Sequence, residues 1–209
     1  MPNNFANAFA MSLLNYTGAY KKQGDLWEYR LVVFPDDAVG QIIEDEKRFL
    51  HHNFFPQPSK AIKPYISIGS FLAKEIMEET LERWIQNICQ LQTSFEVTLN
   101  NFSGFPSGTI YLRVQDHGSL LSLAASLSML DGFIQANECP PVFIEKKPHL
   151  PIAYNLPSTA YDPAIKAFAG RSFFGSFRVD KIYLLKTDAF MKTTIARHFI
   201  LPSHLTPAD

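Results

Sequence analysis

The sequence predicts an α+β fold made of two related halves that share a cleft. Residues 63–68 have the sequence KPYISI, and residues 147–152 repeat it as KPHLPI, with the lysine, the proline and the two aliphatic positions in register. Strand-like and helix-like patterns alternate around both copies, and no Pro/Ser-rich linker divides the chain. A strand that is repeated within one continuous domain indicates a site with pseudo-two-fold symmetry.

Both copies have the pattern of a short strand. The proline biases the lysine before it toward extended backbone, and the apolar residues that follow alternate with other types at period two. Tyr65 and Ser67 therefore share one face, and His149 and Pro151 share the corresponding face of the second copy. The aliphatic residues between them point the opposite way, into a core.

The first half of the chain contains the patterns of two strands, two helices and a hairpin. Residues 29–34 are β-branched and apolar and predict a strand. Asp36 or Asp37 then caps a helix that ends near His51. A second helix, with Ile76, Leu81, Trp84, Ile85 and Ile88 as its buried stripe, is expected over 75–91. Residues 95–99 and 109–114 form the hairpin.

The second half repeats this scheme. A helix is predicted over 119–130, the second motif strand over 148–154, and a short helix to Ala169 that begins with Asp162 as N-cap and Pro163 in its first turn. Strands at 172–177 and 179–186 complete it. These boundaries predict an N-terminal arm at 1–27, a single bilobal domain at 28–186 and a C-terminal tail at 187–209.

Composition limits the classes of function. The chain has 209 residues, 46% of them hydrophobic, which is enough for a sizeable core, and its net charge of −1 argues against strong non-specific binding along nucleic acid. No stretch is expected to span a membrane. Cys89 and Cys139 lack metal-ligand or redox spacing and fit reduced thiols in a cytoplasmic protein, with one disulfide between them as the alternative.

The two motif strands resemble the paired His-x-Thr/Ser motifs of the 2H phosphoesterase superfamily, which includes the bacterial 2'-5' RNA ligases and cyclic phosphodiesterases. The resemblance covers roughly residues 28–186 and implies two pseudosymmetric αβ lobes around a central groove. In that family each histidine is a general acid or base, and each hydroxyl helps to bind phosphate. The chemistry needs no metal and no cofactor, so neither is expected.

Both motifs depart from the family pattern. Tyr65 stands where the first histidine belongs, and Ser67 keeps the hydroxyl. His149 keeps the second histidine, but Pro151 replaces the second hydroxyl and Tyr154 stands where an arginine often follows. An imidazole exchanges protons near neutral pH, whereas an ordinary phenol does so only near pH 10. His149 and Tyr65 are the catalytic candidates, with reduced activity expected.

Candidate substrate-binding residues are Ser67 and the two motif lysines, Lys63 and Lys147, which alternation places on the same face as the motif residues. Arg171 and Arg178 are further candidates for binding phosphate. Each has an ordinary alternative role, because solvated lysines are common at strand ends and a histidine can be purely structural.

Two functions follow from these residues. One is a 2'-5' RNA ligase or cyclic phosphodiesterase-like protein that acts on or recognises 2',3'-cyclic or 2'-5' phosphodiester linkages. The alternative is a non-catalytic protein that binds a nucleotide or an RNA end and retains the groove. A third and weaker hypothesis is a different enzyme, in which His149 is the only motif histidine and Tyr65 is the acid. The expected partner is a nucleotide or phosphorylated RNA end, with no membrane, no extended nucleic-acid surface and a monomeric state.

Overall fold

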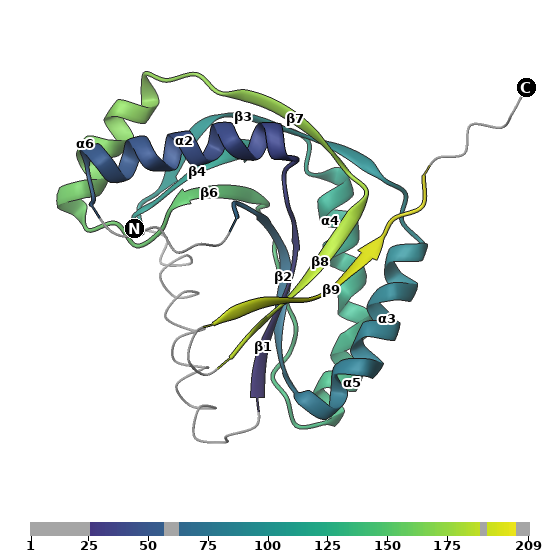
Figure 1. Ribbon diagram of the computed structural model, residues 1–209. Helices are drawn as coiled ribbons and strands as arrows, with labels where there is room; N and C mark the ends of the chain where they lie inside the picture. The colour runs from purple at the N-terminus through teal and green to yellow at the C-terminus, as the bar shows by residue number, and fades with distance from the viewer. Residues whose placement is uncertain (1–25, 57–62, 189–191, 204–209) are drawn as a thin grey trace, which may run out of the picture.

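Two antiparallel sheets form the framework of the molecule (Figure 1). The computed structural model describes residues 26–56, 63–188 and 192–203. The five-stranded sheet has the order β5-β2-β1-β8-β9, with bounds Phe143–Ile144, Ile66–Lys74, Leu26–Val33, Lys181–Thr187 and Thr193–Ile200. The four-stranded sheet has the order β6-β4-β3-β7, with bounds His149–Ala153, Thr109–Val114, Phe95–Phe105 and Phe174–Val179.

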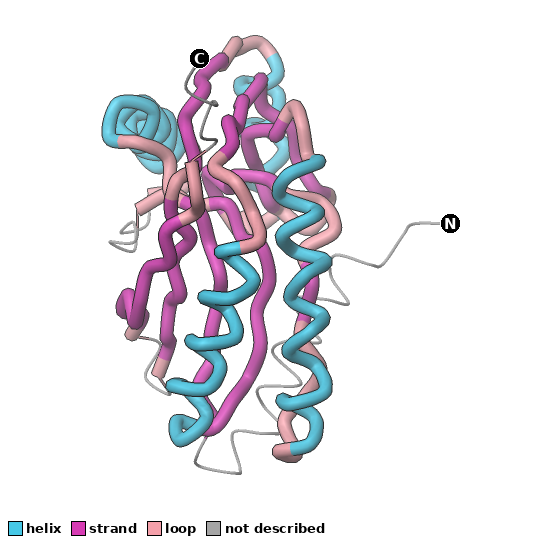
Figure 2. The backbone as a smooth tube through the Cα atoms, turned by 90° about the vertical axis from the view of Figure 1, so that its right-hand side faces the viewer, coloured by secondary structure: helices cyan, strands magenta, loops and turns pink. Residues whose placement is uncertain are grey.

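Helices cover one face of each sheet. α2 (Asp37–Asn53) and α6 (Ser158–Ala169) pack on the four-stranded sheet. The 3₁₀ turn η1 (Glu75–Met77), α3 (Glu78–Gln90), α4 (Gly118–Ser126), the 3₁₀ turn η2 (Leu127–Leu130) and α5 (Asp131–Ala136) pack on the five-stranded sheet. Figure 2 shows these last helices side by side along that sheet. The predicted α+β class with two αβ lobes is confirmed.

Strand alternation separates the covered face of the five-stranded sheet from its other face. Along β1, Tyr29, Leu31 and Val33 are buried beneath the helices, while Glu28 and Arg30 alternate with them and point to the opposite face. Tyr29 stacks on Phe71 of β2 with ring centroids 5.4 Å apart. The face that is free of helices is thus where the polar side chains of β1 gather.

Helix α2 begins where the sequence predicts, and α6 does not. The Asp36 side chain caps α2 by accepting the amide N–H of Val39 at 2.8 Å. Helix α6 already begins at Ser158, preceded by Pro157, so that Asp162 and Pro163 lie inside it. Asp-Pro is a strong start signal, but Pro157 and Ser158 provide an earlier one. The helix tolerates the hydrogen bond that is lost because Pro163 has no amide hydrogen.

The buried stripe of the second predicted helix is partly wrong. Leu81, Ile85 and Ile88 are buried as expected, but Ile76 is 89% exposed and Trp84 is 39% exposed. Residues 75–77 form a 3₁₀ turn, with fewer residues per turn than an α-helix. This change of period brings Met77 into the core in place of Ile76.

At both ends of the predicted domain, the strands extend beyond the predicted boundaries. Residues 1–25 of the predicted arm lie outside the described residues, and β1 already begins at Leu26. Strand β9 lies within the predicted tail, where it pairs with β8 from Lys181–Ile200 to Thr187–Thr193. Most of β9 is exposed, so it has no alternating apolar pattern that would have predicted it.

One segment is longer and more apolar than expected. Gly118–Ala136 is long and apolar enough to span a membrane by length and composition alone. In the structure it is divided into α4, η2 and α5, and Leu120, Leu123 and Ile134 on it are fully buried in the protein core. Packing against β2 and α3 accounts for its composition.

Candidate functional site

The first motif strand carries a β-bulge directly after the motif. Ser67 pairs with Val32 of β1, whereas Gly69 pairs with Leu31, so Ile68 is an extra residue on β2. A bulge shifts the alternation by one position. The motif residues and the residue after Gly69 therefore lie on the same face, away from the helices.

The second motif strand carries the same bulge at the same place. Pro151 pairs with Tyr111 of β4, whereas Ala153 pairs with Ile110, so Ile152 is the extra residue on β6. Ile152 and Ala153 are both buried in the core. The internal repeat thus extends from the motif sequence to an irregularity of the backbone.

Superposing the two registers makes Ser70 of the first strand equivalent to Tyr154 of the second. Ser70 pairs with Arg30 of β1. In the second copy the bulge turns Tyr154 toward the motif face, where 54% of its surface remains exposed. Residues 65, 67 and 70 in one half thus correspond to 149, 151 and 154 in the other.

Strand β5 pairs with the first motif strand and leads directly into the second. Gly69 of β2 pairs with Ile144, and the amide of Glu145 donates to the carbonyl of Ile68 at 3.0 Å. His149 follows Glu145 by only a few positions, a reach of at most about 14 Å for extended chain. β2 and β6 accordingly contact each other although they belong to different sheets.

His149 has a defined ring orientation. Its Nδ1 lies 2.7 Å from the carbonyl oxygen of Lys147, and its ring lies 5.1 Å from that of Phe105 and 5.0 Å from that of Tyr111 between centroids. A carbonyl oxygen only accepts hydrogen bonds, so Nδ1 carries the hydrogen. The neutral ring then presents an unprotonated Nε2, which can accept a proton from a substrate or water.

Tyr65 contacts the other half of the molecule. Its half-buried ring meets Phe34 edge to face at 6.2 Å, and its phenol interacts electrostatically with that of Tyr154. Desolvation raises the pKa of the Tyr154 phenol above its ordinary value, and the Tyr65 phenol raises it further. Tyr154 is therefore a neutral hydrogen-bond donor at physiological pH.

Arg30 stands beside these phenols and was missed by sequence reasoning. It projects from the centre of β1 on the motif face, with 30% of its side chain exposed, and its Nη2 lies 2.5 Å from Glu28 Oε1. Burial by itself lowers the pKa of Arg30, but Tyr65 and Glu28 raise it above its ordinary value. An arginine directly before the apolar residues Leu31, Val32 and Val33 was the available signal, because a charge beside a core segment needs a partner.

The two motif lysines lie in separate places. Lys63 is exposed, with its Nζ 3.4 Å from Asp37 Oδ1, and borders a cavity of about 670 Å³ that Arg178 and Tyr183 also line. Lys147 is exposed just before β6. Among the described residues, the phenols of Tyr65 and Tyr154 interact electrostatically with Arg30. Ser67 is half-buried on the motif face.

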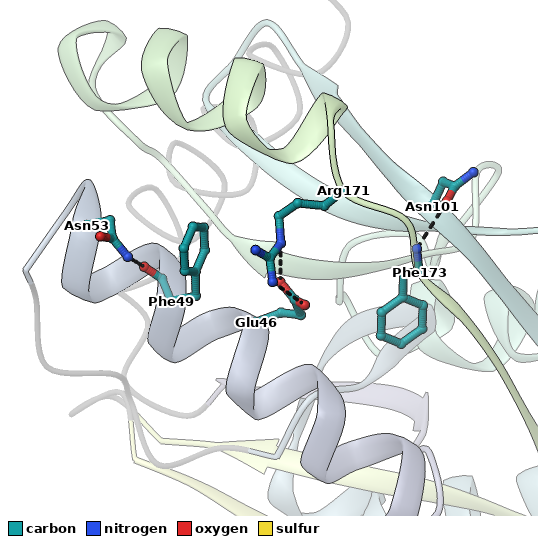
Figure 3. A network of polar contacts seen from close by, with 6 residues as sticks. All are labelled: Glu46, Phe49, Asn53, Asn101, Arg171 and Phe173. Carbon is teal, nitrogen blue, oxygen red and sulfur yellow. Dashed lines mark hydrogen bonds and ion pairs between the residues drawn. The ribbon is translucent and has the colours of Figure 1, made fainter.

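Arg171 has a structural partner instead of an open position. Its guanidinium donates twice to Glu46, at 3.0 and 2.8 Å, and lies 4.2 Å above the ring of Phe49 (Figure 3). Both partners belong to α2, so Arg171 joins that helix to the segment that follows α6. These contacts account for the position of Arg171 without a bound ligand.

The described residues offer no cluster for a metal. Within 26–56, 63–188 and 192–203, no three His, Cys, Asp or Glu side chains gather in a way that could hold an ion. Cys89 and Cys139 are both free and buried, so the disulfide alternative is not what the structure shows. Burial raises the pKa of the Cys89 thiol to about 12.

Two lobes, each with helices outside and a bulged motif strand facing the other lobe, define a bilobal fold of the 2H phosphoesterase type. The model of the 2'-5' RNA ligase superfamily matches residues 34–189, and the chain belongs to this superfamily. No curated sequence matches the chain.

Solved structures agree on the fold. E. coli LigT in its apo form is 16% identical, with a TM-score of 0.62 over 86% of this chain and 99% of that one. The Thermus thermophilus protein TT0787 is 14% identical, with a TM-score of 0.61 over 85% and 99%. E. coli LigT complexed with 3'-AMP is 18% identical, with a TM-score of 0.61 over 85% and 97%.

Proposed function

We propose that the protein acts on or recognises 2',3'-cyclic or 2'-5' phosphodiester linkages at nucleotide or RNA ends, with low catalytic activity. The observation that carries this proposal is the His149 ring, held by the Lys147 carbonyl so that Nε2 is the basic nitrogen. That ring stands at the position of the second family histidine. The LigT complexes with 3'-AMP and with phosphate support a phosphorylated nucleotide as the ligand.

In this proposal, cleavage of a cyclic phosphate divides the proton transfers between two residues. A water oxygen bonds to phosphorus and gives its proton to His149 Nε2. The bond from phosphorus to one ribose oxygen breaks, and that oxygen takes a proton from the Tyr65 hydroxyl. Ser67, Lys63 and Lys147 are proposed to bind the phosphate and to line the path by which it approaches. A positioned acid or base contributes about 10²- to 10⁴-fold, so an ordinary phenol in the acid role keeps turnover low.

A second candidate is favoured by one observation. By the resemblance, Tyr65 stands where the family has its first histidine, and its phenol interacts with that of Tyr154. A protein of this kind binds a nucleotide or RNA end in the groove without turning it over. In both versions the two buried free cysteines fit a reducing, cytoplasmic setting.

The test compares the native chain, His149→Ala and the control His52→Ala, an exposed histidine on the last turn of α2. Each is assayed for hydrolysis of 2',3'-cyclic AMP and titrated with 3'-AMP by calorimetry. Slow hydrolysis that is lost only in His149→Ala supports the enzyme. Binding of 3'-AMP without hydrolysis supports the second candidate. Neither binding nor hydrolysis by the native chain would refute both.

A further inference from the structure

The first motif half has an arginine, Arg30, next to the position that is pseudo-equivalent to Tyr154. Because the bulges coincide, Ser70 is the equivalent of Tyr154, the position at which the family often has an arginine. The residue paired with Ser70 across the sheet is Arg30. A guanidinium is therefore present at the motif face. It lies on the strand next to Ser70, which is the pseudo-equivalent of Tyr154, and it belongs to the opposite lobe from Tyr154.

The surroundings of Arg30 fit the binding of an oxyanion. A guanidinium has five N–H donors in a planar fork, and the hydrogen bond found for Arg30 among the described residues uses one nitrogen, Nη2, on Glu28. The phenols of Tyr65 and Tyr154 lie beside it. Its side chain is neither buried nor fully exposed, so its charge is less screened by solvent than that of a surface arginine.

From this arrangement we propose that Arg30 takes over phosphate binding from the missing arginine, with the Tyr65 and Tyr154 hydroxyls as neutral donors to the same group. This proposal rests on the proposed function, because it names the residues that hold the phosphate in the same groove. Glu28 has the role of orienting the guanidinium, and its negative charge weakens the binding of an anion.

The main experiment moves the charge between the two positions. Titration with 3'-AMP and with inorganic phosphate is performed for the native chain, Arg30→Gln, Tyr154→Arg and the double variant Arg30→Gln/Tyr154→Arg. Loss of a charge-assisted, two-pronged contact weakens binding by about tenfold or more. We expect that loss in Arg30→Gln and substantial recovery in the double variant, since Tyr154 is half exposed and accommodates a longer side chain.

Two further variants report on charge alone. Glu28→Gln is expected to strengthen binding several-fold, because it removes the nearest negative charge from Arg30. Arg171→Gln is the matched control, since Arg171 is engaged by Glu46 at the outer surface of α2 and should leave affinity unchanged. If Arg30→Gln fails to fold by circular dichroism, Arg30→Lys and Glu28→Gln decide, and native affinity in both would refute the role of Arg30.

The outcomes separate this inference from the proposed function. Affinity that falls in His149→Ala but stays native in Arg30→Gln leaves the proposed function in place and overturns the inference. Equal loss in Arg30→Gln and in the double variant, with both folded, also overturns it, because a guanidinium at position 154 would then be no substitute for Arg30. Absence of binding by the native chain overturns both.

Discussion

The phenols of Tyr65 and Tyr154 interact with each other although the two residues adjoin strands of different sheets. Tyr65 immediately precedes β2 and Tyr154 immediately follows β6. The resemblance aligns Tyr65 with the first family histidine and Tyr154 with the family arginine. Two phenols thus occupy the places where the resemblance implies a base and a cation.

Restoring the family residues should raise activity. Tyr65→His supplies a second imidazole, and Pro151→Thr supplies the second hydroxyl, so hydrolysis of 2',3'-cyclic AMP is expected to rise by about 10²-fold or more over the native chain. β6 is an edge strand, where a proline and a threonine are both tolerated. Native turnover as fast as that of the double variant would contradict a weak acid at position 65.

A partly buried ion cluster on the helix-covered face of the sheet should make stability depend on pH. Lys186 Nζ lies 2.6 Å from Glu78 Oε2, and the Tyr29 hydroxyl donates to the same carboxylate at 2.7 Å. Burial by itself raises the pKa of Glu78, but these two donors lower it below its ordinary value. The stabilisation is therefore present above about pH 4.3, the ordinary glutamate pKa, and is lost as the pH falls through the folded pKa.

Lys186→Met measures this contribution. We expect the variant to lose about 1–3 kcal/mol of unfolding free energy at pH 7, between the values for surface and buried pairs. The difference should be smaller at pH 3, because that pH lies below the ordinary glutamate pKa of about 4.3 and the unfolded state then already binds the proton. Lys74→Met is the control, because its partner Glu138 is 90% exposed at 3.8 Å. Urea unfolding at both pH values is the measurement, and a difference independent of pH would contradict the role of Glu78.

Two glycines should respond to alanine in opposite directions. Gly108 has φ +88° between β3 and β4, and a Cβ there would collide with the backbone of Leu156, whose amide donates to Gly108 at 2.9 Å. Gly108→Ala is expected to cost about 2 kcal/mol or more. Gly40, inside α2, has no atom within 4 Å of the place that a Cβ would take, and Gly40→Ala should stabilise by about 0.5–1 kcal/mol. Chemical denaturation of both variants distinguishes local strain from a general effect of added methyl groups.

The buried thiols should resist modification in the folded protein. Burial raises the pKa of Cys89 to about 12, and the Cys139 thiol lies 3.9 Å from the sulfur of Met77 inside the core. We expect neither to react with a thiol-specific disulfide reagent at pH 8, and both to react in urea. Rapid labelling of one cysteine in the native state would show that its part of the core opens readily.

Local signals predicted much of this fold, and irregular backbone explains most of what they missed. Asp36 was one of two candidate caps, and each motif strand follows the predicted alternation only as far as its bulge. The bulges at Ile68 and Ile152 have no sequence signature of their own, so the orientation of Tyr154 could not be derived from alternation. The position of Arg30 depends on which strand lies beside β2, which is a property of the whole sheet.

The site residues divide in the same way. The internal repeat identified His149, Tyr65 and Ser67 as a set, because it is written into the chain twice. Lys63 and Lys147 were grouped with them by alternation alone, and the structure places Lys63 beside Asp37 at the border of a cavity that Phe34 also lines. Long side chains at strand ends have many rotamers, so their direction is set by tertiary neighbours.

The strand order of the larger sheet has a consequence for synthesis of the protein on the ribosome. β1 lies between β2, which follows soon after it, and β8, which ends only at Thr187. The nascent chain must therefore expose one unpaired edge of β1 until almost the whole domain has emerged. The lobes cannot mature one after the other, and the face that carries Arg30 acquires its final neighbours only after β8 has emerged.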